Sequence, residues 1–280
     1  MASIGALLIF GLKFGIEFTG GSAMEVNFTQ NRPANEEITK ALAGFNLGDI
    51  VVQPTGEKGA LLQFAGIDEA THQQILEKLQ ALSPADETSF QYIGPSVGQD
   101  LKNKTIFAIA LSLLTITVYI AVAFRKVSYP VASWKYGITS LIALFHDIIV
   151  PLGIFSLLGK YYNVQITIPI IAALLTILGF SVHDTIVIFD RIRENILRKG
   201  MGQFSATVDQ SLNQTIGRSV STVATTLLVM VSIFLFGGQT LKYFSLTLII
   251  GITCGVYSSI FIAGPLLVTW QKFSEKRSEK

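Results

Sequence analysis

Five apolar stretches, each long enough to cross a lipid bilayer, constrain the fold of this 280-residue chain more than any other feature. Half of the residues are hydrophobic and only 14% are charged, a composition typical of membrane proteins and unusual for a soluble domain. We therefore predict an α-helical polytopic membrane protein. The predicted transmembrane helices are Thr105–Phe124, Tyr136–Leu158, Ile166–Phe189, Ser219–Gly237 and Tyr243–Trp270.

A sixth apolar stretch, Ala2–Gly11, has about half of the length that a bilayer requires. It has no basic region before it and no convincing cleavage site, so a signal peptide is the weaker interpretation. We expect residues 1–12 to form a shortened first helix of a six-helix bundle, whose other five helices lie within residues 104–270.

Charged residues predict the orientation of these helices. Twelve Lys and Arg residues flank one side of the spans, whereas only Lys160 and Lys242 flank the other side. Basic residues mark the cytoplasmic side, so we expect the loop 190–218 and the basic tail 271–280 inside the cell. The region 13–103 is then external, with twelve Asp and Glu against six Lys and Arg. The twelve flanking residues are Arg125, Lys126, Lys135, Arg191, Arg193, Arg198, Lys199, Arg218, Lys272, Lys276, Arg277 and Lys280.

The external region has the pattern of a small α+β domain. Short strands alternate with two stretches of helical periodicity, Pro33–Phe45 and Asp68–Leu82, in the order β-α-β-β-α-β. This order predicts a split βαβ, ferredoxin-like arrangement. Asp68 is the expected N-cap of the second helix, and His72 is expected on a solvated surface. The predicted strands are Glu25–Thr29, Ile50–Thr55, Ala60–Ala65 and Ser89–Ile93.

Asp184 is the strongest indication of function, because it lies inside the apolar stretch Ile166–Phe189. An ionisable group at membrane depth is costly and usually functional. Asp184 lies only about 9 Å along the helix axis from Asp190 at the cytoplasmic end. Arg218 opens the next predicted helix from that same side, so an ion pair with Asp184 is within reach. Such a pair could load and release a proton, or it could be a static bridge between helices.

Other polar residues fall within the predicted spans. The adjacent His146 and Asp147 could form a proton relay or a helix–helix hydrogen bond, and His183 could tune its neighbour Asp184. A face of small and polar residues on the third span suits close helix packing. That face consists of Ala172, Thr176, Gly179 and His183.

Two further patterns concern packing. Gly251, Gly255 and Ser259 form a small-residue ridge that favours close helix contact in the last span. An apolar stripe on a polar segment predicts a helix at the cytoplasmic interface. Its residues are Phe204, Val208, Leu212 and Ile216.

The sequence contains no phosphate-binding loop and no zinc or haem spacing, and Cys254 is its only cysteine. We therefore expect no cofactor, no bound metal, no nucleic-acid partner and no ATP hydrolysis.

Five motifs are distributed over nearly the whole chain. They are Gly15-Ile-Glu-Phe-Thr-Gly-Gly21, Gly94-Pro-Ser-Val-Gly98, His146-Asp147, Ala172-Ala-Leu-Leu-Thr-Ile-Leu-Gly-Phe-Ser181 and Asp184-Thr-Ile-Val-Ile-Phe-Asp-Arg-Ile-Arg-Glu-Asn195. Together they resemble one family, the SecF members of the SecD/SecF family of bacterial protein-export proteins.

The resemblance implies a six-helix bundle of the resistance-nodulation-division type in the bacterial plasma membrane. It implies a complex with SecD beside the SecYEG channel, an indirect link to SecA, and late-stage pulling of unfolded secretory proteins driven by the proton motive force. The intramembrane Asp and Arg of the family correspond to Asp184 and Arg218. His183 stands where SecF sequences commonly have Asn.

Two other classes of function remain open at this point. A proton-coupled small-molecule efflux subunit would use similar intramembrane charges, but it usually has a larger external domain and two six-helix halves. A non-catalytic membrane assembly factor would tolerate the loss of Asp184.

Overall fold

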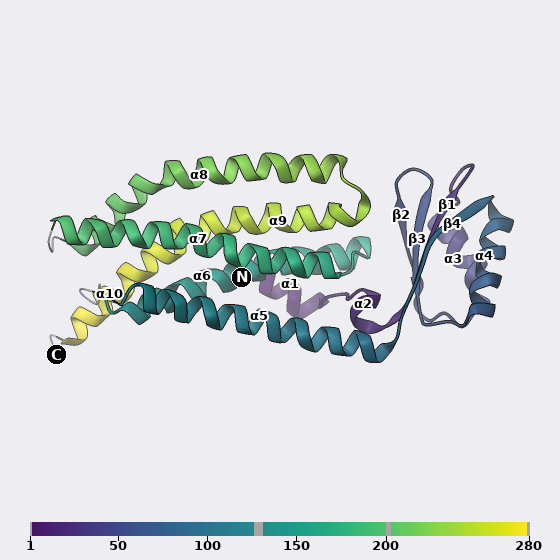
Figure 1. The fold of residues 1–280 in the computed structure, drawn as a ribbon, viewed down its shortest axis with the longest axis horizontal. Helices are drawn as coiled ribbons and strands as arrows, with labels where there is room; N and C mark the ends of the chain where they lie inside the picture. The colour runs from purple at the N-terminus through teal and green to yellow at the C-terminus, as the bar shows by residue number, and fades with distance from the viewer. Residues whose placement is uncertain (1, 126–130, 200–202, 279–280) are drawn as a thin grey trace. The chain divides into compact units, whose positions relative to one another are not determined.

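The computed structural model describes residues 2–125, 131–199 and 203–278, and the order of its elements can be followed in Figure 1. The chain divides into two compact units: residues 10–106 with 155–168, and residues 1–9, 107–154 and 169–280. Lys126 and Lys280 of the charge pattern lie outside the described residues, as do the side chains of Lys199, Lys276 and Arg277.

The first unit contains a four-stranded sheet with strand order β2-β3-β1-β4, in which every neighbouring pair is antiparallel. This arrangement confirms the predicted ferredoxin-like domain. A bulge in the β1–β4 pairing falls between Glu25 and Val26. The strands are β1 (Gly21–Phe28), β2 (Val51–Thr55), β3 (Gly59–Phe64) and β4 (Ala85–Ile93), and the helices are α3 (Asn35–Leu42) and α4 (Glu69–Leu82).

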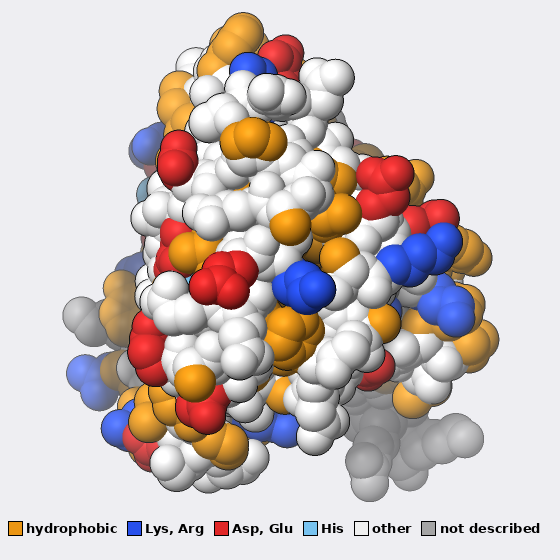
Figure 2. Space-filling view, turned by 90° about the vertical axis from the view of Figure 1, so that its right-hand side faces the viewer, with side chains coloured by type: hydrophobic (Ala, Val, Ile, Leu, Met, Phe, Trp, Pro, Cys, Tyr) orange, Lys and Arg blue, Asp and Glu red, His pale blue; other side chains and the backbone are white. Residues whose placement is uncertain are grey.

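Alternate residues of the central strands face the two helices and bury an apolar core. Met24, Val26 and Phe28 of β1 are fully buried, as are Ile38 of α3 and Ile75 of α4. Because strand side chains alternate between faces, this pattern fixes the register of β1. On the molecular face in view, Asp and Glu side chains are dispersed and do not gather into one patch (Figure 2).

Two sequence expectations for α4 have different outcomes. Asp68 is the N-cap, since its carboxylate accepts a 2.9 Å hydrogen bond from the backbone N–H of Thr71. The expectation that His72 lies on a solvated surface is wrong, because its ring is buried and stacks on Phe90 at 3.9 Å. His72 lies about one helical turn before the core residue Ile75 and therefore shares its buried face of α4. The ring of Phe90 on β4 covers the His72 ring.

Two of the quoted glycine motifs meet within this unit, beside the short helix α2 (Ile16–Thr19). Gly20 and Gly21 have φ values of 76° and 140°, which L side chains rarely adopt. A β-carbon on Gly20 would lie 2.8 Å from Cα of Pro95, and one on Gly98 would lie 2.9 Å from the backbone nitrogen of Gly20. The glycines are therefore required by close backbone approach.

The second unit is helical, and the described residues of the two units include five helices that are long and apolar enough to cross a membrane. Each predicted span falls on one of these helices, and each helix is longer than its predicted span and extends beyond at least one end of it. The elements are α1 (Ala2–Phe10), α5 (Pro95–Ala123), α6 (Ser133–Tyr162), α7 (Ile168–Lys199), α8 (Phe204–Phe236), α9 (Gln239–Ser258), the π-helical turn η1 (Ser259–Ala263) and α10 (Gly264–Ser278).

The predicted helix at the cytoplasmic interface is not separate, because Phe204 to Phe236 form one continuous helix. Most of its apolar stripe packs against the bundle, with Val208 buried and with Phe204 and Leu212 beside the same core, whereas Ile216 is exposed. Apart from Gln203, the described residues of the predicted loop 190–218 are helical. A stripe of this kind indicates a helix with one buried face, but it does not indicate whether protein or lipid covers that face.

The small-residue ridge of α9 contacts α7, as predicted. A β-carbon on Gly251 would lie 2.1 Å from Cδ1 of Ile177, and one on Gly255 would lie 3.1 Å from Cβ of Ser181. One turn further along, the hydroxyls of Thr185 and Ser259 are 2.8 Å apart.

The expectation that Ala172, Thr176, Gly179 and His183 form a packing face is wrong within this chain. These residues are exposed, and no described atom lies within 4 Å of a β-carbon built on Gly179. Both faces of α7 carry small and polar residues, so spacing alone did not reveal which face turns inward.

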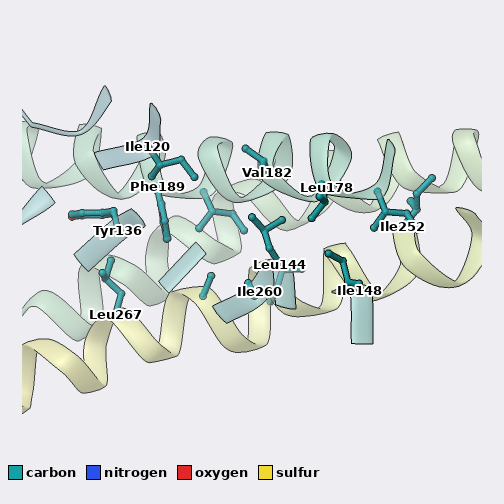
Figure 3. Packing of buried hydrophobic residues seen from close by; sticks show 14 of the residues in the cluster. Ile120, Tyr136, Leu144, Ile148, Leu178, Val182, Phe189, Ile252, Ile260 and Leu267 are labelled. Carbon is teal, nitrogen blue, oxygen red and sulfur yellow. The ribbon is translucent and has the colours of Figure 1, made fainter. Parts of the chain in front are cut away.

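Apolar side chains from several helices fill the interior of the bundle (Figure 3). Near one end, the rings of Tyr136 and Phe189 meet edge to face with centroids 5.1 Å apart. This apolar packing surrounds the polar residues described next.

Candidate functional site

Asp147 lies on α6 and is completely buried. Its Oδ2 accepts hydrogen bonds from Ser181 of α7 at 2.6 Å and from Ser258 of α9 at 2.7 Å. Its Oδ1 lies 2.9 Å from Nδ1 of His146, and the proton position on that ring depends on the tautomer. The carboxylate thus joins three helices. The sequence left two roles open for His146 and Asp147, a proton relay or a helix–helix hydrogen bond. The structure contains the helix–helix hydrogen bonds of Asp147.

Asp184 lies on α7 and is 8% exposed. Its Oδ1 accepts a hydrogen bond from the hydroxyl of Ser219 on α8, while its Oδ2 is buried and has no hydrogen-bond partner among the described residues. A charged carboxylate is costly to bury unless it is paired and hydrogen-bonded. The free energy of the bundle therefore depends on whether Asp184 carries a proton.

Arg218 does not form the predicted ion pair with Asp184 among the residues that the structure describes. Its side chain is exposed, and the following residue, Ser219, makes the contact instead. Consecutive residues of an α-helix are turned by about 100° around the axis. Because Ser219 faces α7, Arg218 is directed away from it.

His183 is also exposed and precedes Asp184 on α7. It belongs to the same uncovered face as Gly179. His183 is therefore adjacent to Asp184 in the sequence, but its side chain lies outside the buried polar centre.

Sequence reasoning did not identify the hydroxyl groups that organise the centre, although it singled out Ser259 as part of a packing ridge. These groups belong to Ser181, Thr185, Ser219, Ser258 and Ser259. Thr185 also donates to the backbone carbonyl of Ser181 at 3.1 Å, which links neighbouring contacts along α7. The spacing of the ridge that begins at Gly251 identified Ser259 as a packing residue, but it did not identify the hydrogen bond of Ser259 with Thr185. The remaining hydroxyls carry no distinguishing pattern in the sequence.

The Asp-Arg-Ile-Arg-Glu-Asn part of the longest motif connects α7 to α8 beyond this centre. Asn195 is buried and donates hydrogen bonds to Ser211 at 2.8 Å and to Gln214 at 2.9 Å. Nε of Arg191 also donates to Gln214, at 2.7 Å. These residues hold the ends of the two helices that carry Asp184 and Ser219.

Fold and site together define a polytopic helical membrane protein with a ferredoxin-like domain and two buried carboxylates held by hydroxyl groups. Residues 73–273 match the C-terminal region of the SecD/SecF protein export membrane proteins, and residues 5–31 match the SecD/SecF GG motif.

Curated relatives agree with this match. The chain is 43% identical to the protein translocase subunit SecF of Thermobaculum terrenum, over 95% of this chain and 86% of that protein. It is 36% identical to the SecF subunit of Desulfurispirillum indicum, over 93% of this chain and 83% of that protein. The crystal structure of SecDF from Thermus thermophilus, described as a translocon-associated membrane protein, superposes with a TM-score of 0.84 at 32% identity.

That superposition covers 96% of this chain but only 36% of the SecDF chain. The chain belongs to the SecD/SecF family, and within it to the SecF protein translocase subunits.

Proposed function

We propose that this chain assists late-stage protein export through the SecYEG channel by using the proton motive force, in a complex with SecD. The observation that carries the proposal is Asp184, buried at membrane depth with one carboxylate oxygen lacking a hydrogen-bond donor among the described residues. Protonation removes the charge that is costly to bury there, so binding and release of a proton can bias one conformation of the bundle over another.

In this proposal Asp184 is the proton-carrying group, and Ser219 holds one of its oxygens in every charge state. Arg218 precedes Ser219 on α8, and its guanidinium reaches the Asp184 carboxylate only after α8 rotates or the Arg218 side chain moves. His146 and Asp147 are a candidate relay, and His183 influences the proton affinity of its neighbour. Each elementary charge that crosses 100 mV exchanges about 2.3 kcal/mol, which is enough to shift a two-state equilibrium.

The proposal also assigns an orientation and partners. The charge pattern supports a plasma-membrane subunit with the α+β domain outside and the C-terminus in the cytoplasm. SecD and the channel are its expected direct partners, SecA acts indirectly, and the α+β domain receives unfolded secretory chains. The outer edges of β2 and β4 have no strand beside them among the described residues, which leaves backbone groups for an extended chain.

The test is Asp184→Asn, which keeps size and polarity but removes the titratable charge. We expect the variant to assemble with SecD normally and to lose the part of export that depends on an imposed proton gradient, measured in membrane vesicles. Asp209→Asn, which removes an exposed carboxylate of α8, is the matched control. If Asp184→Asn exports at the wild-type rate under the same gradient, Asp184 is a structural residue and the proton role is wrong.

A further inference from the structure

The acidic residue of the Gly15–Gly21 motif has no role in the function proposed above. Glu17 lies on α2 and is half-buried, and its Oε2 is shielded from solvent without a hydrogen-bond partner among the described residues. A buried polar atom of this kind costs free energy unless it gains a partner or loses its charge. Close packing accounts for the glycines of the motif but not for Glu17.

The missing side chain of Gly15 makes room for the Glu17 carboxylate. A β-carbon on Gly15 would lie 2.3 Å from Oε2 of Glu17, 3.3 Å from the carbonyl oxygen of Ile166 and 3.3 Å from Cγ2 of Thr167. Gly15 has φ −68° and ψ 170°, which any residue can adopt. The constraint at this position is therefore space for the carboxylate and not backbone conformation.

No cation in the described part of the chain pairs with Glu17. Two lysines lie on the neighbouring elements, but each has another partner. Nζ of Lys13 donates to Oδ1 of Asn163 at 2.6 Å, and Nζ of Lys102 lies 5.5 Å from the centre of the Phe14 ring. On α5, Asp100 pairs with Lys104 at 2.8 Å. The space over Gly15 that holds Oε2 of Glu17 is bordered by the Ile166 carbonyl oxygen and the Thr167 methyl group.

The Glu17 carboxylate lies where loop 13–21 is bonded to the segment 163–167, which leads into α7. The backbone N–H of Gly15 donates to the carbonyl oxygen of Ile166 at 2.9 Å, and the backbone N–H of Ile166 donates to the carbonyl oxygen of Lys13 at 2.7 Å. The carbonyl oxygen of Asn163 accepts a 3.0 Å hydrogen bond from Gln53 of β2. These bonds hold the segment that immediately precedes α7.

We propose that Glu17 is a second proton-binding site, and that its charge controls the attachment of residues 163–167 to loop 13–21. A protonated carboxyl is neutral and can donate towards an acceptor such as the Ile166 carbonyl oxygen. A carboxylate cannot donate, and its charge draws water into the attachment. Because Glu17 is only half-buried, the proton is exchanged directly with water.

The direction of the pH dependence follows from burial. Burial raises the pKa of the Glu17 carboxyl above its ordinary value, opposed by a hydrogen bond from its own backbone N–H. A raised pKa means that the closed attachment is most stable at low pH and loses stability as the pH rises through the folded-state pKa. For each unit of pKa displacement, the equilibrium between closed and open attachment changes about tenfold.

The test measures hydrogen exchange of residues 13–19 and 163–168 in the full chain in lipid nanodiscs, with rates corrected for the intrinsic effect of pH. In the wild type, we expect protection to fall as the pH rises. Glu17→Gln imitates the protonated state and should keep protection high at every pH. Glu36→Gln, which removes an exposed carboxylate of α3, should behave as the wild type. An unchanged pH dependence in Glu17→Gln would overturn the proposal.

A second variant covers the case in which Glu17→Gln does not fold. Gly15→Ala leaves Glu17 in place but displaces its carboxylate into water, so the pH dependence should disappear. Retention of the wild-type pH dependence in Gly15→Ala refutes the proposal, as does constant protection in the wild type. These readouts do not involve export or Asp184, so a failure here is distinct from a failure of the proposed function.

Discussion

Replacement of Gly251 by alanine tests the close approach of α9 to α7. The new methyl group would lie 2.1 Å from Cδ1 and 2.5 Å from Cγ1 of Ile177, a fully buried and β-branched side chain. Overpacking of this kind costs about 1–3 kcal/mol, and the better helix propensity of alanine offsets about 1 kcal/mol of it. We therefore expect Gly251→Ala to lower the free energy of unfolding by up to about 2 kcal/mol.

Gly179 provides the matched control, because a β-carbon there meets no described atom within 4 Å. Gly179→Ala should gain helix propensity without a clash, so the two variants should differ by about 1–3 kcal/mol. The assay is the unfolding free energy of the purified chain in detergent micelles. Equal stability of the two variants would refute the close approach of α7 and α9.

A double-mutant cycle sharpens the assay. Ile177→Ala removes all three atoms that the new methyl group would meet, at a cost of about 2–5 kcal/mol by itself. In the double variant, the methyl group of Ala at position 251 occupies part of the vacated space. The destabilisation of the double variant should therefore be smaller than the summed destabilisation of Gly251→Ala and Ile177→Ala by at least about 1 kcal/mol.

Two further predictions concern orientation and the α+β domain. In a Cys254→Ala background, Asp86→Cys should react with a membrane-impermeant reagent added to intact cells and Gln203→Cys should not; the reverse pattern would contradict the charge-based orientation. Hydrogen bonds from the side chain and backbone of Thr71 hold the pKa of Asp68 below its ordinary value, so its capping contribution should be present at neutral pH and be lost as the pH falls through the folded-state pKa. Asp68→Ala should speed hydrogen exchange in the first turn of α4 at neutral pH, and a rate equal to that of the wild type would show that the cap contributes nothing.

Much of the architecture was predictable because its signals are local. Span length, the β-α-β-β-α-β order and the Asp68 cap each depend on residues close together in the sequence. The ridge at Gly251 was also predictable, since small residues repeated every four positions indicate close contact whatever the partner is.

The candidate site was less predictable because it depends on helix rotation. Asp184 was identified from membrane depth alone, but its hydrogen-bond donor is Ser219 and not the neighbouring Arg218. A rotation of one residue decides between these partners, and no sequence pattern fixes that rotation. The partners of Asp147 were missed for a related reason, since serine is common in membrane helices and bonds to its own backbone as readily as to another helix.

Two consecutive serines stand where the π-helical turn Ser259–Ala263 begins, and they point in different directions, as consecutive residues of a helix do. Ser258 donates to Asp147 on α6, while Ser259 contacts Thr185 on α7. A π turn accommodates an extra residue compared with regular α-helix. The π turn therefore rotates the part of the helix that follows it relative to the part that precedes it. The residues that contact neighbouring helices before the turn and after it can consequently change independently, although the helix is continuous.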